Sequence, residues 1–179
     1  SVSKRYSGCG ARIGALVCRN AEVMAGALKF AQARLSPPTL GQIGAEALCA
    51  LPQEYYDAIV REYAARRDVV VAALRAMPGT VVPEVRGAFY IMPALPIDDA
   101  DRFCRWLLEG FAHEGETVML APGTGFYATP GLGRQEVRIA YVLERAKLER
   151  AMAVLARALE AYPGREPVAV GAATAAAAP

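Results

Sequence analysis

The sequence predicts an α/β segment over residues 1–51, followed by a long helix and a small α+β domain over residues 52–164. Three observations predict this order. A short apolar run, residues 13–17, precedes a helical pattern, as in a strand followed by a helix. A helical period then extends from Pro52 to about Met77. Beyond it, short β-type runs alternate with two further helical patterns.

Residues 1–51 contain one predicted strand and two predicted helices. Residues 13–17 are apolar, which favours a buried strand. Asn20 is a residue type that caps helices, so we expect a helix from residue 21 to about 33. Prolines then break the chain, and Thr39 is expected to cap a helix over residues 40–51.

Residues 52–164 begin with a helix longer than the globular average, which suits a connection between two domains. A turn at Arg86-Gly87 predicts a hairpin from residues 81–85 and 88–92. The remaining predicted elements are a helix capped by Asp98 or Asp99, strands over 118–121 and 137–142, and a helix over 144–162. Residues 165–179, alanine-rich toward the end, are expected to form a disordered tail.

Composition excludes several classes of function. The chain is 54% hydrophobic and 21% charged, so it can form a core. Its net charge of +2 favours neither nucleic acid nor a membrane surface, and no apolar run approaches the roughly 20 residues that span a bilayer. Four cysteines and one histidine show no metal-ligand spacing. We therefore expect no metal and reduced thiols in a cytoplasmic protein, and we expect a natural segment before Ser1.

The first fourteen residues carry the most informative chemistry. Lys4 follows Ser1 and Ser3, and Arg12 lies eight residues later in a glycine-rich loop. Hydroxyls and a guanidinium suit a phosphate, and a lysine beside other cations becomes a nucleophile toward an aldehyde. These are the parts that pyridoxal 5′-phosphate (PLP) needs. On composition alone, a solvated basic loop is an equal alternative.

This segment resembles the PLP-attachment signature of the class I and II aminotransferases, which are fold-type I enzymes. The matching positions are Ser1, Ser3, Lys4, Gly10, Arg12, Ile13 and Gly14. The resemblance implies that Lys4 is the catalytic Schiff-base lysine, with Ser1, Ser3 and Arg12 binding the cofactor. Gly8 departs from the pattern, because an apolar side chain is usual there.

Three later motifs resemble the same family in the same order. They are Arg-Gly-Ala-Phe-Tyr at 86–90, Ala-Pro-Gly with Phe126 at 121–126, and Glu-Val-Arg-Ile-Ala-Tyr at 136–141. The resemblance implies that Arg138 binds the substrate α-carboxylate, and Phe126 could line the substrate site. By residue type alone, Arg138 could instead pair with Glu136 or Glu144, and Phe126 could be core.

The resemblance covers residues 1–164 and implies the C-terminal part of the family's fold. Residues 1–51 would end the large PLP-binding domain, and residues 52–164 would form the connecting helix and the small domain, with the active site between them. Tyr6 could lie near the cofactor phosphate or across a subunit interface, or simply pack. Arg34 is not assigned a substrate role.

The sequence is most similar to bacterial aspartate aminotransferases. The implied function is a PLP-dependent transaminase that moves an amino group between an L-amino acid, aspartate, and a 2-oxo acid, 2-oxoglutarate, in a cytoplasmic homodimer. Other family residues at the cofactor precede the lysine, so this chain alone should be inactive. Alternatives are a lyase or aminocyclopropane-carboxylate synthase type of enzyme, an aminotransferase-like sensor domain of a transcription regulator, and an inert folded module.

Overall fold

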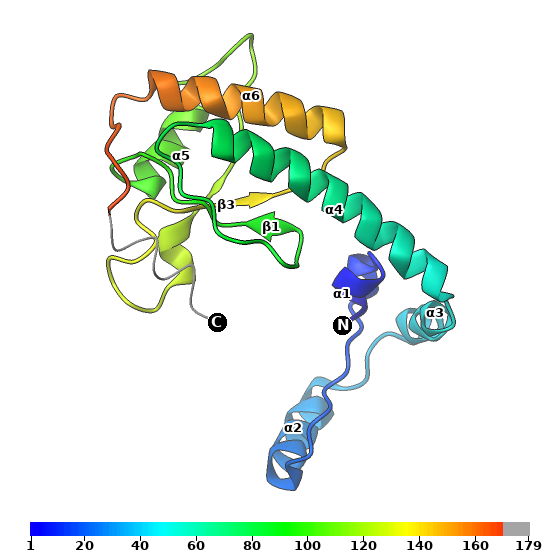
Figure 1. Ribbon diagram of the computed structural model, residues 1–179. Helices are drawn as coiled ribbons and strands as arrows, with labels where there is room; N and C mark the ends of the chain where they lie inside the picture. The colour runs from blue at the N-terminus through cyan, green and yellow to red at the C-terminus, as the bar shows by residue number, and fades with distance from the viewer. Residues whose placement is uncertain (170–179) are drawn as a thin grey trace. The chain divides into compact units, whose positions relative to one another are not determined.

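The computed structural model describes residues 1–169, which form two compact units (Figure 1). The first unit is Ser1–Asp57, and the second begins at Ala58. The long helix α4, Gln53–Ala76, starts in the first unit and lies mostly in the second. The prediction of a long helix after Pro52 is therefore confirmed, with its first residue one position later.

The first unit is built from helices. They are α1 (Val2–Arg5), the short 3-10 helix η1 (Cys9–Ala11), α2 (Ala21–Arg34) and α3 (Thr39–Cys49). The Asn20 side chain accepts hydrogen bonds from the backbone N–H groups of Glu22 and Val23, so the predicted cap of α2 is confirmed. The predicted cap at Thr39 is wrong, because α3 already includes Thr39 and Pro38 holds the capping position.

The strand predicted over residues 13–17 is absent. This segment has no regular secondary structure, and Leu16 and Val17 are 60% and 90% exposed. A strand requires a neighbouring strand to satisfy its backbone groups. The described residues of the first unit contain no such neighbour, so an apolar run alone does not form the strand here.

The second unit contains a three-stranded antiparallel sheet. Its strands are β1 (Tyr90–Ile91), β2 (Ala121–Pro122) and β3 (Val137–Ala140), in the spatial order β1-β3-β2. The central strand β3 pairs Ala140 with Tyr90 on one edge and Arg138 with Ala121 on the other. Because side chains alternate along a strand, these four residues share one face of the sheet.

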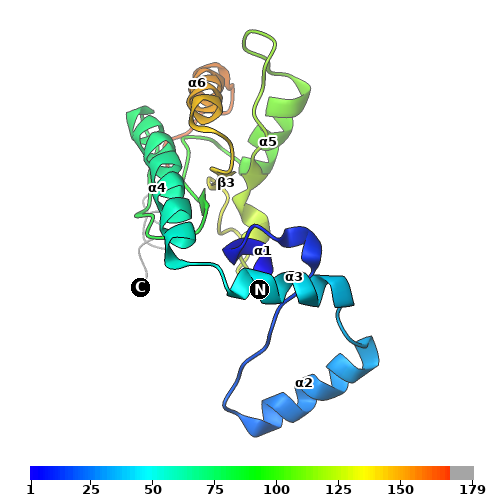
Figure 2. The same ribbon diagram turned by 90° about the vertical axis from the view of Figure 1, so that its right-hand side faces the viewer.

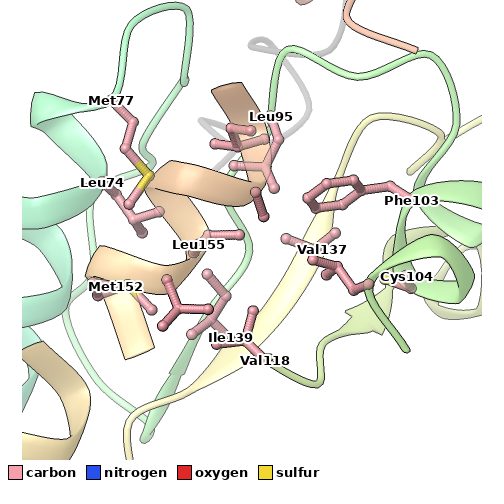
Figure 3. Close-up of a cluster of buried hydrophobic side chains, with 14 of the residues drawn as sticks. Leu74, Met77, Leu95, Phe103, Cys104, Val118, Val137, Ile139, Met152 and Leu155 are labelled. Carbon is pink, nitrogen blue, oxygen red and sulfur yellow. The ribbon is translucent and has the colours of Figure 1, made fainter. Parts of the chain in front are cut away.

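Helices pack against the opposite face of β3. α5 (Ala100–Glu109) is capped by Asp99, as predicted, and α6 (Arg145–Ala161) lies beside α4 in both views (Figures 1 and 2). Figure 3 shows Val137 and Ile139 of β3 between side chains of α5 and α6. The core residues labelled there are Leu74, Met77, Leu95, Phe103, Cys104, Val118, Val137, Ile139, Met152 and Leu155.

The structure corrects three further predictions in this unit. The hairpin is reduced to a single bridge between Val81 and Ala94, and residues 81–85 form no strand. The strand expected over residues 118–121 is displaced to Ala121–Pro122, and the one expected over 137–142 ends at Ala140. Short pairings suffice here because the helices, rather than the ladder, bury most of the apolar surface.

A disordered tail was expected over residues 165–179, but its first residues are bonded to the second unit. Arg165 pairs with Ile97, the Glu166 N–H donates to the Pro96 carbonyl, and the Gln135 amide donates to the Pro167 carbonyl. Nearby, the Tyr162 hydroxyl donates to the Asp98 carboxylate over 2.8 Å. These bonds fix residues 165–167 on the second unit, and residues 170–179 lie outside the described part of the chain.

Candidate functional site

Arg138 lies on the face of β3 that points away from the core. Its strand neighbours Val137 and Ile139 are 0% and 4% exposed, whereas Arg138 is only half-buried. The guanidinium lies 4.6 Å from the ring centre of Phe126 and 5.6 Å from that of Tyr90. Two aromatic rings therefore flank one cation, a contact worth about 0.5–2 kcal/mol per pair depending on its exposure to water.

Neither carboxylate considered as a partner for Arg138 pairs with it. Among the described residues, Arg138 forms no ion pair. Glu136 is 4% exposed and accepts a hydrogen bond from the Tyr127 hydroxyl instead. That bond raises the pKa of Tyr127 to about 12. The guanidinium is thus held by aromatic rings and keeps its hydrogen-bond donors for an anion.

A closed loop connects β2 to β3 and carries both Phe126 and Tyr127. Gly123 donates its N–H to the Glu136 carbonyl over 2.7 Å, and Glu136 donates its own to the Gly133 carbonyl over 3.0 Å. A Cβ added at Gly123 would lie 2.6 Å from the Glu136 carbonyl oxygen and 2.7 Å from that of Gly133. Only glycine allows the two ends of the loop to approach this closely.

The lysine-bearing segment of the first unit folds back on itself. The Val2 N–H donates to the Ile13 carbonyl over 3.1 Å, and a Cβ on Gly14 would lie 3.6 Å from Ser1. Both ends of the 14-residue motif are therefore adjacent. Ser1 Oγ accepts the Ser3 N–H over 3.2 Å as the cap of α1, which leaves its own hydroxyl proton available to an anion.

Arg12 and Lys4 are both exposed on this segment. Arg12 has a left-handed backbone, with φ 55° and ψ 39°, and its guanidinium donates to the Cys9 carbonyl over 3.1 Å. Lys4 lies on α1, two residues after the buried Val2. The residue types on this segment suit a phosphate, through the Ser1 and Ser3 hydroxyls and the Arg12 guanidinium, and an aldehyde, through the Lys4 amine.

Sequence reasoning missed an aromatic cluster beside Lys4. The Arg5 guanidinium lies 4.6 Å from the Tyr56 ring centre, and the Tyr6 ring meets Tyr56 edge-on at 5.9 Å. The Tyr6 hydroxyl also lies 4.0 Å from the Cys49 sulfur, to which it donates. Tyr6 therefore packs against Tyr56 and Cys49, and packing was one of the three roles considered for it. Residues 5 and 56 are too far apart in the chain for any spacing pattern to pair them.

No helix within residues 1–169 combines the length and apolar character needed to cross a lipid bilayer. Nor does that part of the chain bring together three histidine, cysteine or acidic side chains able to hold a metal ion.

Comparisons with known proteins identify the family of this chain. The family model described as aminotransferase class I and II matches residues 1–155, a span that includes both the Lys4 segment and Arg138. The chain therefore belongs to the class I and II aminotransferases, a family that uses PLP.

The matched region is a larger share of this chain than of each individual relative. An aspartate aminotransferase of Pyrococcus horikoshii is 38% identical over 102 residues, which are 56% of this chain and 24% of that protein. The aspartate aminotransferase structure of Rhizobium meliloti is 27% identical, with a TM-score of 0.71, over 89% of this chain and 40% of its own. An alanine aminotransferase structure of Pyrococcus furiosus is 26% identical, with a TM-score of 0.74, over 90% and 41%. The chain thus spans about a quarter to two fifths of these relatives.

The close approach at Gly123 gives a testable prediction. Gly123→Ala should lower the free energy of unfolding by about 1–3 kcal/mol, because its Cβ would collide with two backbone carbonyls. Gly125→Ala, in the same turn but with nothing within 4 Å of the added carbon, is the matched control and should change little. Urea unfolding of both variants measures the difference; equal stabilities would contradict the steric argument.

Proposed function

We propose that the protein containing this chain is a PLP-dependent transaminase. The observation that carries the proposal is a family match extending over both the lysine-bearing segment and the Arg138 strand. We propose further that residues 1–51 end the cofactor-binding domain, and that residues 52–164 are the connecting helix and small domain. By the same resemblance, the whole protein is a cytoplasmic homodimer.

Ser1 and Arg12 are proposed to bind the cofactor phosphate, and Ser3 is proposed to contact the cofactor. Their donors lie on one segment whose ends meet, and Arg12 supplies the charge that a phosphate dianion requires. When bound, PLP supplies an aldehyde and an electron-withdrawing ring that stabilises negative charge at the substrate α-carbon. The chain's contribution is to hold that group in place and to provide the acid–base chemistry around it.

Lys4 is proposed to have two roles. Its Nζ would hold the cofactor at the aldehyde carbon, with loss of water, until a substrate amine takes its place. The freed Nζ is then the base that removes the proton from the substrate α-carbon, and the acid that returns a proton. A primary amine on a short exposed helix can serve both roles, because its four-carbon chain allows the small movement between them.

Arg138 is proposed to bind the substrate α-carboxylate. The planar guanidinium can donate two parallel hydrogen bonds to a planar carboxylate, and the Phe126 and Tyr90 rings hold it without using its donors. A fixed carboxylate orients the α-carbon, so the bond to be broken is presented in one direction. Arg138 therefore contributes binding and orientation, whereas Lys4 contributes the chemistry.

Aspartate and 2-oxoglutarate are the proposed substrates. Support comes from two relatives that carry the name aspartate aminotransferase, and from the motifs that resemble bacterial enzymes of that group. The alanine aminotransferase of similar fold makes alanine the specific competitor to test.

Lys4 gives the first prediction from this function. We expect borohydride treatment of the full-length protein with PLP to fix the cofactor on Lys4, because reduction makes the lysine–cofactor bond permanent. Mass spectrometry of the digested protein locates the modified lysine. The chain's other lysines, Lys29 and Lys147, serve as internal controls. Modification of either one in place of Lys4, or an unchanged yield in Lys4→Ala, would refute the assignment.

The substrate assignment is tested separately on the same protein. Aspartate should change the visible absorption spectrum of the cofactor-loaded protein, and 2-oxoglutarate should reverse the change, because each half-reaction moves the amino group in one direction. Alanine and phenylalanine are the comparison compounds. If aspartate leaves the spectrum unchanged while another amino acid alters it, the protein is a transaminase of different specificity.

Arg138 gives a kinetic prediction. Arg138→Lys should raise the KM for the amino acid roughly 10- to 100-fold, because a charge-assisted hydrogen bond is worth about 1.5–3 kcal/mol and lysine loses the paired geometry. Arg134→Gln removes a nearby exposed arginine that contacts Asp99 and is the control. Steady-state kinetics of the full-length protein supply the comparison, and equal KM values for Arg138→Lys and the parent would contradict the role.

A further inference from the structure

The loop between β2 and β3 contains a buried polar pair that the proposed reaction does not use. The Tyr127 hydroxyl donates to the Glu136 carboxylate, and Glu136 is the single buried charged side chain among the described residues. A buried carboxylate is costly unless it is hydrogen-bonded, so this position requires a reason. Its location gives one: Glu136 lies two residues before Arg138, and Tyr127 directly follows Phe126.

We propose that Tyr127 and Glu136 are positioning residues for Arg138, acting through the Phe126 ring. This inference rests on the proposed role of Arg138 in binding carboxylate. Tyr127 ties the outer part of the loop to Glu136, the residue before β3, and Phe126 is the side chain that this bond places over the guanidinium. Without the tie, the loop would keep its closed base but lose the anchor next to Phe126.

The contacts around the loop support this division between its base and its outer part. Gly123, Gly133 and Glu136 close the base through backbone hydrogen bonds of 2.7 and 3.0 Å. Phe126 is 47% exposed, so burial alone does not fix its ring. On the α5 side, the Thr124 hydroxyl donates to Asp101 over 2.7 Å, but Asp101 is exposed and such bonds are weak in water.

Chemistry also explains why the pair is a tyrosine and a carboxylate. An O–H donor to an ionised acceptor makes a short, strong hydrogen bond, which is directional enough to fix a ring. The bond favours the neutral phenol, in line with the raised pKa of Tyr127. Glu136 is thereby occupied and does not compete with a substrate carboxylate for Arg138. One bond both positions the aromatic neighbour and keeps a carboxylate away from the cation.

Nuclear magnetic resonance of the arginine side chains in the 179-residue chain tests the proposal. Protons near an aromatic face resonate upfield, so the Arg138 side chain should be displaced upfield by Phe126 and Tyr90. Arg138→Lys assigns the signal by its disappearance. In Tyr127→Phe, most of the upfield displacement should be lost although the ring remains. Glu136→Ala should give the same loss.

Two variants separate positioning from general stability. Glu136→Gln keeps an acceptor oxygen for the Tyr127 hydroxyl and should retain most of the displacement. Tyr162→Phe removes an equivalent tyrosine–carboxylate bond, to Asp98, elsewhere in the same unit. It should leave the Arg138 signal unchanged.

The positioning role is overturned if Tyr127→Phe and Glu136→Ala both give the parent Arg138 signal, or if Tyr162→Phe shifts it as much as Tyr127→Phe does. Failure of the carboxylate-binding role is a different result, an unchanged KM in Arg138→Lys. The two hypotheses can therefore fail independently.

Discussion

In the second unit, β3 is hydrogen-bonded on both edges, and the alternation of its side chains determines which of its residues face the core and which face the opposite side. Val137 and Ile139 point into the core between α5 and α6, which requires Arg138 to point to the other face. A shift of one residue in register would bury the guanidinium and expose the two apolar side chains. The core and the cation are thus fixed by the same pleat, and neither can move without the other.

The loop between β2 and β3 supplies contacts that surround Arg138 at this fixed position. Its glycines close the base, its tyrosine is tied to Glu136, and its phenylalanine covers the cation. Each contact is made to β3 itself or to a residue that immediately precedes it. The arrangement around Arg138 therefore depends on β3, on this loop and on Tyr90 of β1, all in the same unit.

The sequence predicted helices well and strand pairings poorly, for a physical reason. α2 and α5 have side-chain caps, and α4 and α6 follow a helical period, so local sequence is sufficient to place them within a residue or two. Strands depend on partners. Residues 13–17 have the composition of a buried strand, yet the first unit offers no neighbouring strand, and residues 14–17 remain exposed. The hairpin prediction located the turn region but not the length of the pairing.

The candidate site shows the same contrast between local sequence signals and long-range packing. Lys4, Arg12, Phe126 and Arg138 were found from the residue types and spacings that resemble the family, and their roles remain predictions. The partners of these residues could not be found in that way. Tyr90 contacts Arg138 from a strand 48 positions away, and Arg5 meets Tyr56 across a similar gap. Such contacts arise from packing, which no local pattern encodes.

For Glu136, the partner expected from the sequence differs from the partner in the structure, and the difference bears on Arg138. A strand arginine two positions from a glutamate suggests an ion pair, since side chains at i and i+2 share a face. The structure instead gives the glutamate a tyrosine and gives the arginine two rings. An arginine already paired with a carboxylate would have to break that pair to bind a substrate. One held by aromatic faces keeps its donors, so the separate partners are what make Arg138 suitable for binding an anion.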